Sequence, residues 1–383
     1  MRIAQVAPLH ESVPPQKYGG TERVVHFLTE ELVSRGHEVT LFASGDSQTS
    51  ADLHACVPRA LRLGRQPIDP TVPETLQLEA VCRQAQRFDI IHFHTGHLHF
   101  PLSSRLGVPH LTTQHGRLDL TDLPELYQVF AEIPLVSISD HQRTPLPRAN
   151  WQATIHHGLP ADRYALVRQA DDYLVFVGRI APEKRLDRAI AIATAVGLPL
   201  RVAAKIDRVD RDYFQTAIRP LIQGNPLVEF VGEIDDLDKQ ELIGRARALL
   251  FPIDWPEPFG LVMIEAMACG TPVIAWRNGS VPEVMHEGVT GFVVDSHEAA
   301  VAATERVRAI DRAGVRALFE ARYTAPRMAD DYERLYGSLS QPRWTDCRWT
   351  KPSPAFSRRG EPQKDDGFCG FAAAASGDGT FDR

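Results

Sequence analysis

The chain has few cysteines, and their spacing suggests no structural role. Its 383 residues include five cysteines, at Cys56, Cys82, Cys269, Cys347 and Cys369. No two of them form a Cys-x-x-Cys pair, and no Cys/His pair has the spacing of a zinc site. We therefore expect free or buried thiols in a reducing compartment, which predicts a cytoplasmic protein.

Long hydrophobic runs and an excess of positive charge are also missing. No segment approaches the roughly 20 apolar residues of a membrane-spanning helix, and no apolar leader precedes the first strand pattern. The formal net charge of −7 argues against nucleic acid as the main partner. The helix pattern at 21–34 directs Arg23 and His26 outward but has no dense basic stripe. Strong membrane docking is therefore not indicated, and peripheral membrane contact stays open.

What is present is a regular alternation of strand and helix patterns, which predicts parallel sheets covered by helices. In the first half we expect a helix at 21–34 and strands at 3–8, 39–43, 90–94, 111–114, 135–138 and 155–157. In the second half we expect strands at 174–178, 200–204, 228–231, 249–252 and 273–276. The helices there are expected at 186–196, 212–222, 239–248 and 260–268.

This pattern predicts an α/β fold of two tandem Rossmann-like, doubly wound domains that face each other across a cleft. We expect the domains at 1–165 and 166–323, followed by a helix at 324–339 that packs back toward the N-terminal domain. Residues 340–383 are rich in glycine, proline, serine and charge, which predicts a disordered tail.

The most informative segment is the stretch at 251–275. A strand leads to a polar loop with Glu257, and a helix then begins at Gly260 with Glu265 inside it. A helix start at the carboxyl end of a strand favours an anionic ligand, because free backbone N–H groups and the helix dipole point there. Carboxylates would repel a phosphate but suit sugar hydroxyls. The segment therefore predicts a ligand with both groups, such as a sugar nucleotide.

A second segment adds positive charge at the same edge of the same sheet. Gly178-Arg179-Ile-Ala-Pro182-Glu183-Lys184 ends a strand and enters a helix. Arg179 and Lys184 could neutralise a diphosphate without a metal ion. Taken alone, this stretch could equally be a solvated basic turn.

Together, the two segments resemble the E-x7-E motif (Glu257 to Glu265) and the basic phosphate loop (Gly178 to Lys184) of the retaining glycosyltransferases of family 4. That family has the GT-B architecture, and the resemblance runs from Met1 to about Leu339. It implies sugar transfer from a nucleoside-diphosphate sugar to an acceptor hydroxyl, with retained configuration and without metal or other cofactor. The second domain would bind the donor and the first the acceptor.

The resemblance also assigns roles to residues. Arg179 and Lys184 match the pair that binds the donor diphosphate, Glu257 the residue for hydroxyls of the transferred sugar, and Glu265 the residue for the ribose. The backbone of Phe259, Gly260 and Leu261 would face the sugar and phosphate, and Gly19 and Gly20 match the glycine loop that admits both substrates. His115 matches the position near C6 of the sugar. His94 and Ser139 are candidates for the acceptor side.

Several of these residues have simpler interpretations. Gly19-Gly20 could be an ordinary turn between strand and helix, and Ser139 could cap a helix. His92 is expected in the core. His92 and His94 share one strand face without a third ligand, so no metal is expected. Asp236-Leu-Asp238 more plausibly caps a helix than binds a metal, and Glu283 caps a helix or positions the donor loop. His156-His157-Gly158 departs from the family pattern, which commonly has asparagine before this glycine, so we expect an altered hinge.

Other functions were weighed against sugar transfer. A sugar-nucleotide epimerase, or a pyridoxal-dependent phosphorylase with Lys205 as its lysine, would suit the same architecture. A non-catalytic sugar-nucleotide sensor would not need Glu257 or His115. A dehydrogenase is disfavoured because the first strand–helix turn lacks a GxGxxG sequence. The base, the sugar, the acceptor (lipid, saccharide or small metabolite) and the oligomeric state stay open.

Overall fold

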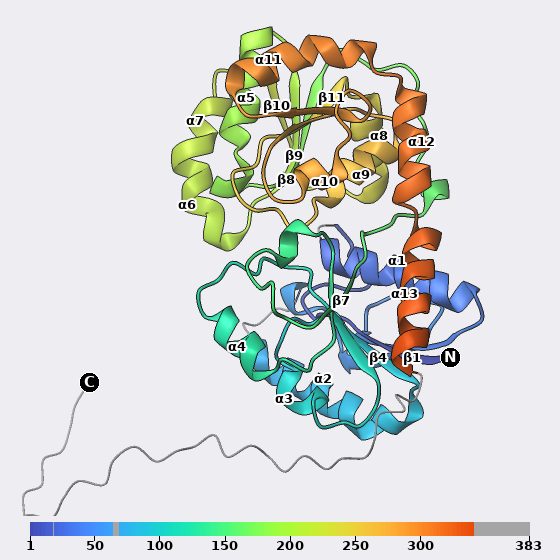
Figure 1. Ribbon diagram of the computed structural model, residues 1–383. Coiled ribbons are helices and arrows are strands. Elements are labelled where there is room, and N and C mark those ends of the chain that lie inside the picture. Colours follow the sequence, from blue (N-terminus) through green and yellow to red (C-terminus); the bar gives the residue numbers. More distant parts are fainter. Residues whose placement is uncertain (18, 64–68, 341–383) are drawn as a thin grey trace, which may run out of the picture. The chain divides into compact units, whose positions relative to one another are not determined.

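The computed structural model describes residues 1–17, 19–63 and 69–340 (Figure 1). Apart from Ser340, the predicted tail at 340–383 lies outside the described residues, as do Cys347 and Cys369. Cys56, Cys82 and Cys269 are free thiols. In the described parts, no helix has both the length and the apolar character needed to cross a bilayer.

The first half of the chain forms a parallel sheet of seven strands in the order β3-β2-β1-β4-β5-β6-β7. The strands are β1 Arg2–Val6, β2 Glu38–Ser44, β3 Asp52–Val57, β4 Ile90–Phe93, β5 His110–Thr113, β6 Leu135–Ser137 and β7 Trp151–Thr154. The helices are α1 Gly20–Ser34, α2 Thr71–Gln84, α3 Phe100–Ser103 and α4 Leu123–Val129. The strand order reverses beside β1, where the fold places a ligand crevice.

The second half forms a parallel sheet of six strands in the order β10-β9-β8-β11-β12-β13. The strands are β8 Leu174–Arg179, β9 Leu200–Lys205, β10 Val228–Gly232, β11 Ala248–Phe251, β12 Val273–Trp276 and β13 Gly291–Val294. The helices are α5 Leu186–Val196, α6 Arg211–Tyr213, α7 Arg219–Ile222, α8 Asp236–Arg245, α9 Leu261–Ala268, α10 Val281–Val284, α11 His297–Arg306 and α12 Arg312–Arg322. The predicted α/β fold with two doubly wound sheets is confirmed.

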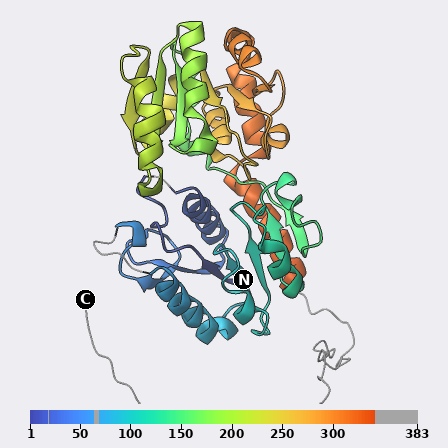
Figure 2. The ribbon, with the colours of Figure 1, turned by 90° about the vertical axis from the view of Figure 1, so that its left-hand side faces the viewer.

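Helices cover both faces of the second sheet (Figure 2), because successive side chains of its strands are apolar and point to opposite faces. Leu174 and Phe176 of β8 pack in one apolar cluster with residues of α5 and α11. Val175, between them in sequence, belongs to another cluster with residues of α9. Successive side chains of a strand point to opposite faces, so a fully buried strand is apolar at every position.

The last helix, α13 (Ala325–Ser340), contacts α1 of the first half, while α12 contacts α9 of the second (Figure 1). Its side chains Tyr332 and Tyr336 are fully buried. At its surface, Arg35, directly after α1, forms an ion pair with Glu333 at 2.6 Å. The predicted helix at 324–339 is therefore present, whereas the exact domain boundaries stay a prediction.

Some expectations about individual elements are wrong. The strand expected at 155–157 lies at β7 instead, because β7 is an edge strand whose half-buried residues give only a weak apolar pattern. The helix expected at 212–222 is α6 and α7 joined by a π-helical turn at Phe214–Ile218. The helix expected at 239–248 is α8, which begins earlier, at Asp236, and ends at Arg245. Ala248 already belongs to β11. The elements β3, β13, α2, α3, α4, α11 and α12 were not anticipated.

Candidate active site

A cavity of about 1350 Å³ is lined by residues of both halves of the chain. It lies at the carboxyl ends of β8, β9 and β11 and at the start of α1 and α9. The residues predicted for catalysis and donor binding all line it: Gly19, Gly20, His115, Arg179, Lys184, Glu257, Phe259, Gly260, Leu261 and Glu265. The two candidates for the acceptor side, His94 and Ser139, do not.

The loop between β11 and α9 presents Glu257 to this cavity. The Glu257 carboxylate forms an ion pair with Lys184 and accepts a hydrogen bond from Trp255 Nε1 at 3.0 Å. Gly260 ends the loop with a left-handed backbone, at φ 79°. A Cβ there would lie 2.8 Å from the side chain of Met263. Only glycine adopts this turn without strain and with so little space, so it sets the direction in which α9 begins.

Glu265 is buried in α9 and belongs to a row of alternating charges. Its Oε1 accepts a hydrogen bond from Lys239 Nζ at 2.6 Å, and the same ammonium lies 3.0 Å from Asp236 Oδ1. Asp236 in turn pairs with Arg23 of α1 at 2.6 Å. A buried charge is tolerated only when it is paired in this way. The expectation that Arg23 points outward is wrong, since its side chain is only 6% exposed and lines the cavity; His26 is buried as well.

The basic loop after β8 carries its own carboxylates. Arg179 donates to Glu183 Oε1 at 2.5 Å, and its Nη1 lies 3.5 Å from Asp210 Oδ2. Pro182 begins a short 3-10 turn that ends with Lys184. Both cations predicted for the diphosphate therefore have a carboxylate partner, and a phosphate would compete with those partners for the same donors.

The histidine side of the cavity is neutral. Burial lowers the pKa of His115 to about 3, so its imidazole is uncharged at neutral pH and acts through hydrogen bonds. Its ring stacks on that of His157, with centroids 5.2 Å apart. His157 in turn meets the ring of Phe259, so this wall joins a first-half residue to the loop before α9.

The two acceptor-side candidates have structural roles instead. His94 is buried beneath His115, and its two ring nitrogens contact His115 Nε2 and Gln5 Oε1, each at 2.8 Å. Ser139 is fully buried, and its Oγ accepts a hydrogen bond from the Gln142 backbone N–H at 3.1 Å. This bond stabilises the short turn at His141–Arg143, although the N-cap of that turn is Asp140. Neither His94 nor Ser139 lines the cavity.

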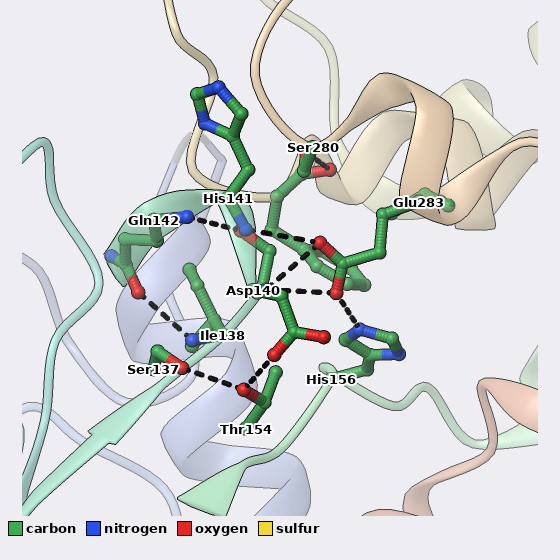
Figure 3. A network of polar contacts seen from close by, with 12 residues as sticks. Ser137, Ile138, Asp140, His141, Gln142, Thr154, His156, Ser280 and Glu283 are labelled. Carbon is green, nitrogen blue, oxygen red and sulfur yellow. Dashed lines mark hydrogen bonds and ion pairs between the residues drawn. The ribbon is translucent and has the colours of Figure 1, made fainter. Parts of the chain in front are cut away.

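Glu283 caps a turn, but in the other half of the chain (Figure 3). Its carboxylate accepts hydrogen bonds from the backbone N–H groups of Asp140, at 2.9 Å, and His141, at 3.3 Å. It also pairs with His156 Nε2 at 2.6 Å. His156, at the departure from the family pattern, therefore has a defined partner across the two halves.

In the Asp-x-Asp sequence at 236–238, the first carboxylate is already paired with two cations. The helix cap is the preceding Asp235, whose Oδ1 accepts from the backbone N–H groups of Leu237 and Asp238. Asp236 pairs with Arg23 and Lys239, so the expected cap within 236–238 is wrong, and the cap is Asp235. Across the described ranges, no group of three or more His, Cys, Asp or Glu side chains is arranged to hold a metal ion.

Two carboxylates of the cavity were not anticipated. Glu22, in the first turn of α1, is 6% exposed, and burial raises its pKa to about 7. Its place directly after Gly19-Gly20-Thr21 was a signal that could have identified it. Glu11 pairs with Arg62. Glu11 lies in loop sequence without periodicity, and nothing local indicates that it reaches the cavity wall.

Two family models match the chain, one for each half. Residues 163–311 match the model described as "Glycosyl transferases group 1", and residues 18–170 match the model "Glycosyltransferase Family 4". Among curated proteins, the glycogen synthase of Mycobacterium tuberculosis is 28% identical over 386 residues, covering 87% of this chain and 91% of its own length. The D-inositol 3-phosphate glycosyltransferase of Rhodococcus jostii is 26% identical over 382 residues, covering 82% and 81%.

Solved structures agree with this assignment. AviGT4, a glycosyltransferase involved in avilamycin A biosynthesis, is 25% identical with a TM-score of 0.69, covering 88% of this chain and 98% of its own. The fold also matches Anabaena HepE, solved in complex with UDP-glucose, at 20% identity and a TM-score of 0.67, covering 88% and 100%. The chain belongs to glycosyltransferase family 4, and it is a glycosyltransferase of the two-domain GT-B fold.

Proposed function

We propose that the enzyme transfers a hexose from a nucleoside-diphosphate sugar to an acceptor hydroxyl, with retention of configuration and without a metal ion. The observation that carries this proposal is the convergence of Arg179, Lys184, Glu257 and Glu265 on one cavity. These residues supply donors for a diphosphate and acceptors for sugar hydroxyls at the same sheet edge. A ligand that has both groups satisfies them together.

Each residue has one task in the proposed reaction. Arg179 and Lys184 stabilise the negative charge that grows on the departing diphosphate, which is the main catalytic contribution of such donors. Glu257 accepts hydrogen bonds from hydroxyls of the transferred sugar, and Glu265 accepts them from the ribose. Lys184 exchanges its pairing with Glu257 for the phosphate as the donor binds.

In this proposal the acceptor hydroxyl attacks the anomeric carbon from the same face that the diphosphate leaves. The anomeric configuration is therefore retained. A phosphate oxygen then takes the proton of the acceptor hydroxyl, so no protein side chain need act as nucleophile. The carboxylates Glu257 and Glu265 both pair with lysines, which suits binding roles rather than covalent catalysis. Two cations at the diphosphate make a metal ion unnecessary.

A uridine diphosphate sugar is our first candidate for the donor, because HepE was solved with UDP-glucose and shares this fold. The acceptor is a saccharide, small metabolite or lipid, and the names of the curated relatives favour a saccharide or a cyclitol phosphate. We place the reaction in the cytoplasm, with peripheral membrane contact left open. The phosphorylase alternative is disfavoured because the Lys205 side chain already pairs with Asp207 at 2.9 Å. The epimerase and sensor alternatives are left to the test below.

The first test is a thermal-shift panel of UDP, GDP, ADP and their common sugars, in EDTA and then in Mg²⁺. We expect one nucleotide to raise the melting temperature in EDTA, and we expect Glu265→Ala to abolish that shift. Glu241→Ala is the matched control, since Glu241 is exposed on α8 and pairs only with Arg245 among the ion pairs described. A shift that requires Mg²⁺ would contradict metal independence, and no shift with any nucleotide would contradict the donor site.

Product analysis separates the enzyme classes. With a nucleotide sugar that binds, we expect release of the nucleoside diphosphate and an α-linked product from an α-linked donor, observed by NMR. Inversion at the anomeric carbon would contradict retention. Conversion of the sugar while it stays on the nucleotide would indicate an epimerase, and tight binding without turnover on any acceptor would favour the sensor.

A further inference from the structure

Among the described residues, only one other than glycine has a left-handed backbone, and it joins the basic loop to α5. This residue, Arg185, has φ 54° and ψ 48°. It directly follows Lys184, and its carbonyl oxygen accepts a hydrogen bond from the Arg188 N–H of α5 at 3.0 Å. A left-handed backbone costs free energy for any residue that has a Cβ atom. Glycine would avoid that cost, so the Arg185 side chain has to contribute something that glycine cannot.

The guanidinium of Arg185 bridges two segments of the second half. On its own side, Nε and Nη2 donate to the Asp187 carboxylate of α5 at 2.9 Å and 2.7 Å. On the other side, Nη1 donates to Asp254 Oδ2 at 2.8 Å, and Arg188 Nη2 donates to the same oxygen at 3.1 Å. Asp254 belongs to the loop between β11 and α9, shortly before Glu257. The Arg185 side chain therefore links the basic loop to the loop that presents Glu257.

These links lie outside the cavity, directly beside two residues that line it. Lys184 and Glu257 line the cavity, whereas Arg185 and Asp254 do not. A backbone hydrogen bond supports the same connection, since the Asp254 N–H donates to the Glu183 carbonyl oxygen at 2.8 Å. Contacts behind the cavity wall therefore set how the basic loop and the loop after β11 lie relative to each other.

We propose that Arg185 is a positioning residue that holds Lys184 and Glu257 at the spacing between the diphosphate and the transferred sugar. The inference rests on the proposed function, in which Lys184 leaves Glu257 for the phosphate as the donor binds. Once that ion pair has opened, it no longer fixes the distance between the two side chains. The link from Arg185 to Asp254 does not touch the ligand, so it stays closed and keeps the two loops in place.

Asp254→Ala tests the link between the loops, and Asp187→Ala is its matched control. Both substitutions remove one carboxylate partner of Arg185 and leave its backbone as it is. The two carboxylate side chains are partly exposed, Asp254 by 50% and Asp187 by 34%, so both variants are expected to fold. Asp187 lies on the same side as Lys184, and its removal leaves the two loops linked.

Calorimetry with UDP and UDP-glucose measures whether the spacing is kept. UDP has no hexose and does not need Glu257, so Asp254→Ala should keep the affinity for UDP. UDP-glucose needs both loops, and a displaced Glu257 weakens the hydrogen bonds to the sugar. We expect Asp254→Ala to lower the affinity for UDP-glucose relative to UDP by roughly tenfold, the effect of one hydrogen bond to a charged group. Asp187→Ala should keep the wild-type ratio. An unchanged ratio in Asp254→Ala would overturn the proposal.

Arg185→Gly separates positioning from stability. Glycine adopts the left-handed backbone without strain, which offsets the loss of partly exposed ion pairs, so the melting temperature should change little. The affinity ratio should nevertheless fall as in Asp254→Ala. The double variant should lose no more than either single variant, because both substitutions break the same link. Additive losses, or a lower melting temperature with an unchanged ratio, would overturn the positioning role. Failure of the wild type to bind UDP would instead refute the proposed donor and, with it, the spacing inferred here.

Discussion

The two halves of the chain build the two sides of the cavity in different ways. In the second half, the residues that face the cavity are charged and paired, as in Lys184 with Glu257 and Lys239 with Glu265. In the first half, the part of the wall that meets the loop before α9 consists of uncharged imidazoles, His115 and His157, with His94 behind them. Charged side chains suit the recognition of a diphosphate and of the negative charge that develops on it as it departs. Neutral rings suit the shape and the hydroxyls of a sugar.

The difference also concerns what holds each side in place. The paired charges of the second half would leave an uncompensated buried ion if one partner were removed. The histidines of the first half would instead acquire a charge in a buried site if the pH fell. The two sides should therefore fail under different perturbations, which the following experiments use.

Removing one partner of the Lys239–Glu265 pair should have the largest effect on stability. Lys239→Met leaves Glu265 buried without its ammonium partner, and breaking such a pair costs about 3–5 kcal/mol. Chemical denaturation would measure the free energy of unfolding. Arg201→Met is the control, since its pair with Glu229 is exposed and should be worth at most about 1 kcal/mol. A loss no larger than that of the control would contradict the structural role of the buried pair.

Arg179→Ala should act on turnover rather than on stability. Removing one donor that stabilises developing charge typically lowers kcat by roughly 10²–10³. Release of the nucleoside diphosphate under saturating donor would measure this. Arg277→Ala, at an exposed pair with Asp295 outside the cavity lining, should leave turnover unchanged. If the two variants have the same kcat, Arg179 does not stabilise the leaving group.

The first half should be the acid-sensitive side. Burial lowers the pKa values of His92, His94, His115 and His157. Below the unfolded pKa near 6.5, the unfolded chain binds protons that the folded chain does not, so stability must fall as the pH drops. Each such group contributes about 1.4 kcal/mol per pH unit in that window.

Melting temperatures between pH 8 and pH 4.5 would measure this loss. His115→Gln removes one of the four groups, so its melting temperature should decrease less steeply below pH 6.5. Equal slopes in the variant and the wild type would show that His115 titrates normally in the folded enzyme.

Glu22 should make the free energy of unfolding depend on pH in the opposite direction to the buried histidines, and with a smaller effect. Its folded pKa of about 7 lies above the usual value of 4.5, so the folded chain binds the proton more strongly. Stability from this group is full at low pH and declines as the pH rises from 4.5 to 7. Glu22→Gln should therefore stabilise the enzyme by about 1–2 kcal/mol at pH 8 and have little effect at pH 4. A loss of stability at pH 8 would contradict the raised pKa.

That the residues proposed for donor binding lie together could be predicted from the sequence, because they lie in short continuous segments. Arg179 and Lys184 are five residues apart, and Glu257 and Glu265 flank one helix start, so local geometry alone brings them to one sheet edge. The first-half contacts could not be predicted in this way. Gln5 and Tyr336 are 331 positions apart in sequence, and no local pattern indicates that they meet.

The wrong expectations also concern residues whose environment depends on contacts between distant parts of the chain. Arg23 looks like a surface residue of an amphipathic helix, and only the approach of α8 buries it against Asp236. His94 and Ser139 end strands as functional residues often do, yet their polar atoms are used by Gln5, His115 and Gln142. Whether a polar side chain faces a cavity or a neighbour depends on what packs against it.

By itself, the sequence determined the alternation of strands and helices, the two doubly wound halves and the charged loops of the second one, because periodicity and turn residues act over a few positions. The tertiary structure decided which side chains share a buried environment. That environment makes histidines neutral and raises the pKa of Glu22. Desolvation and hydrogen bonding depend on all the neighbours of a group, and those neighbours come from distant parts of the chain.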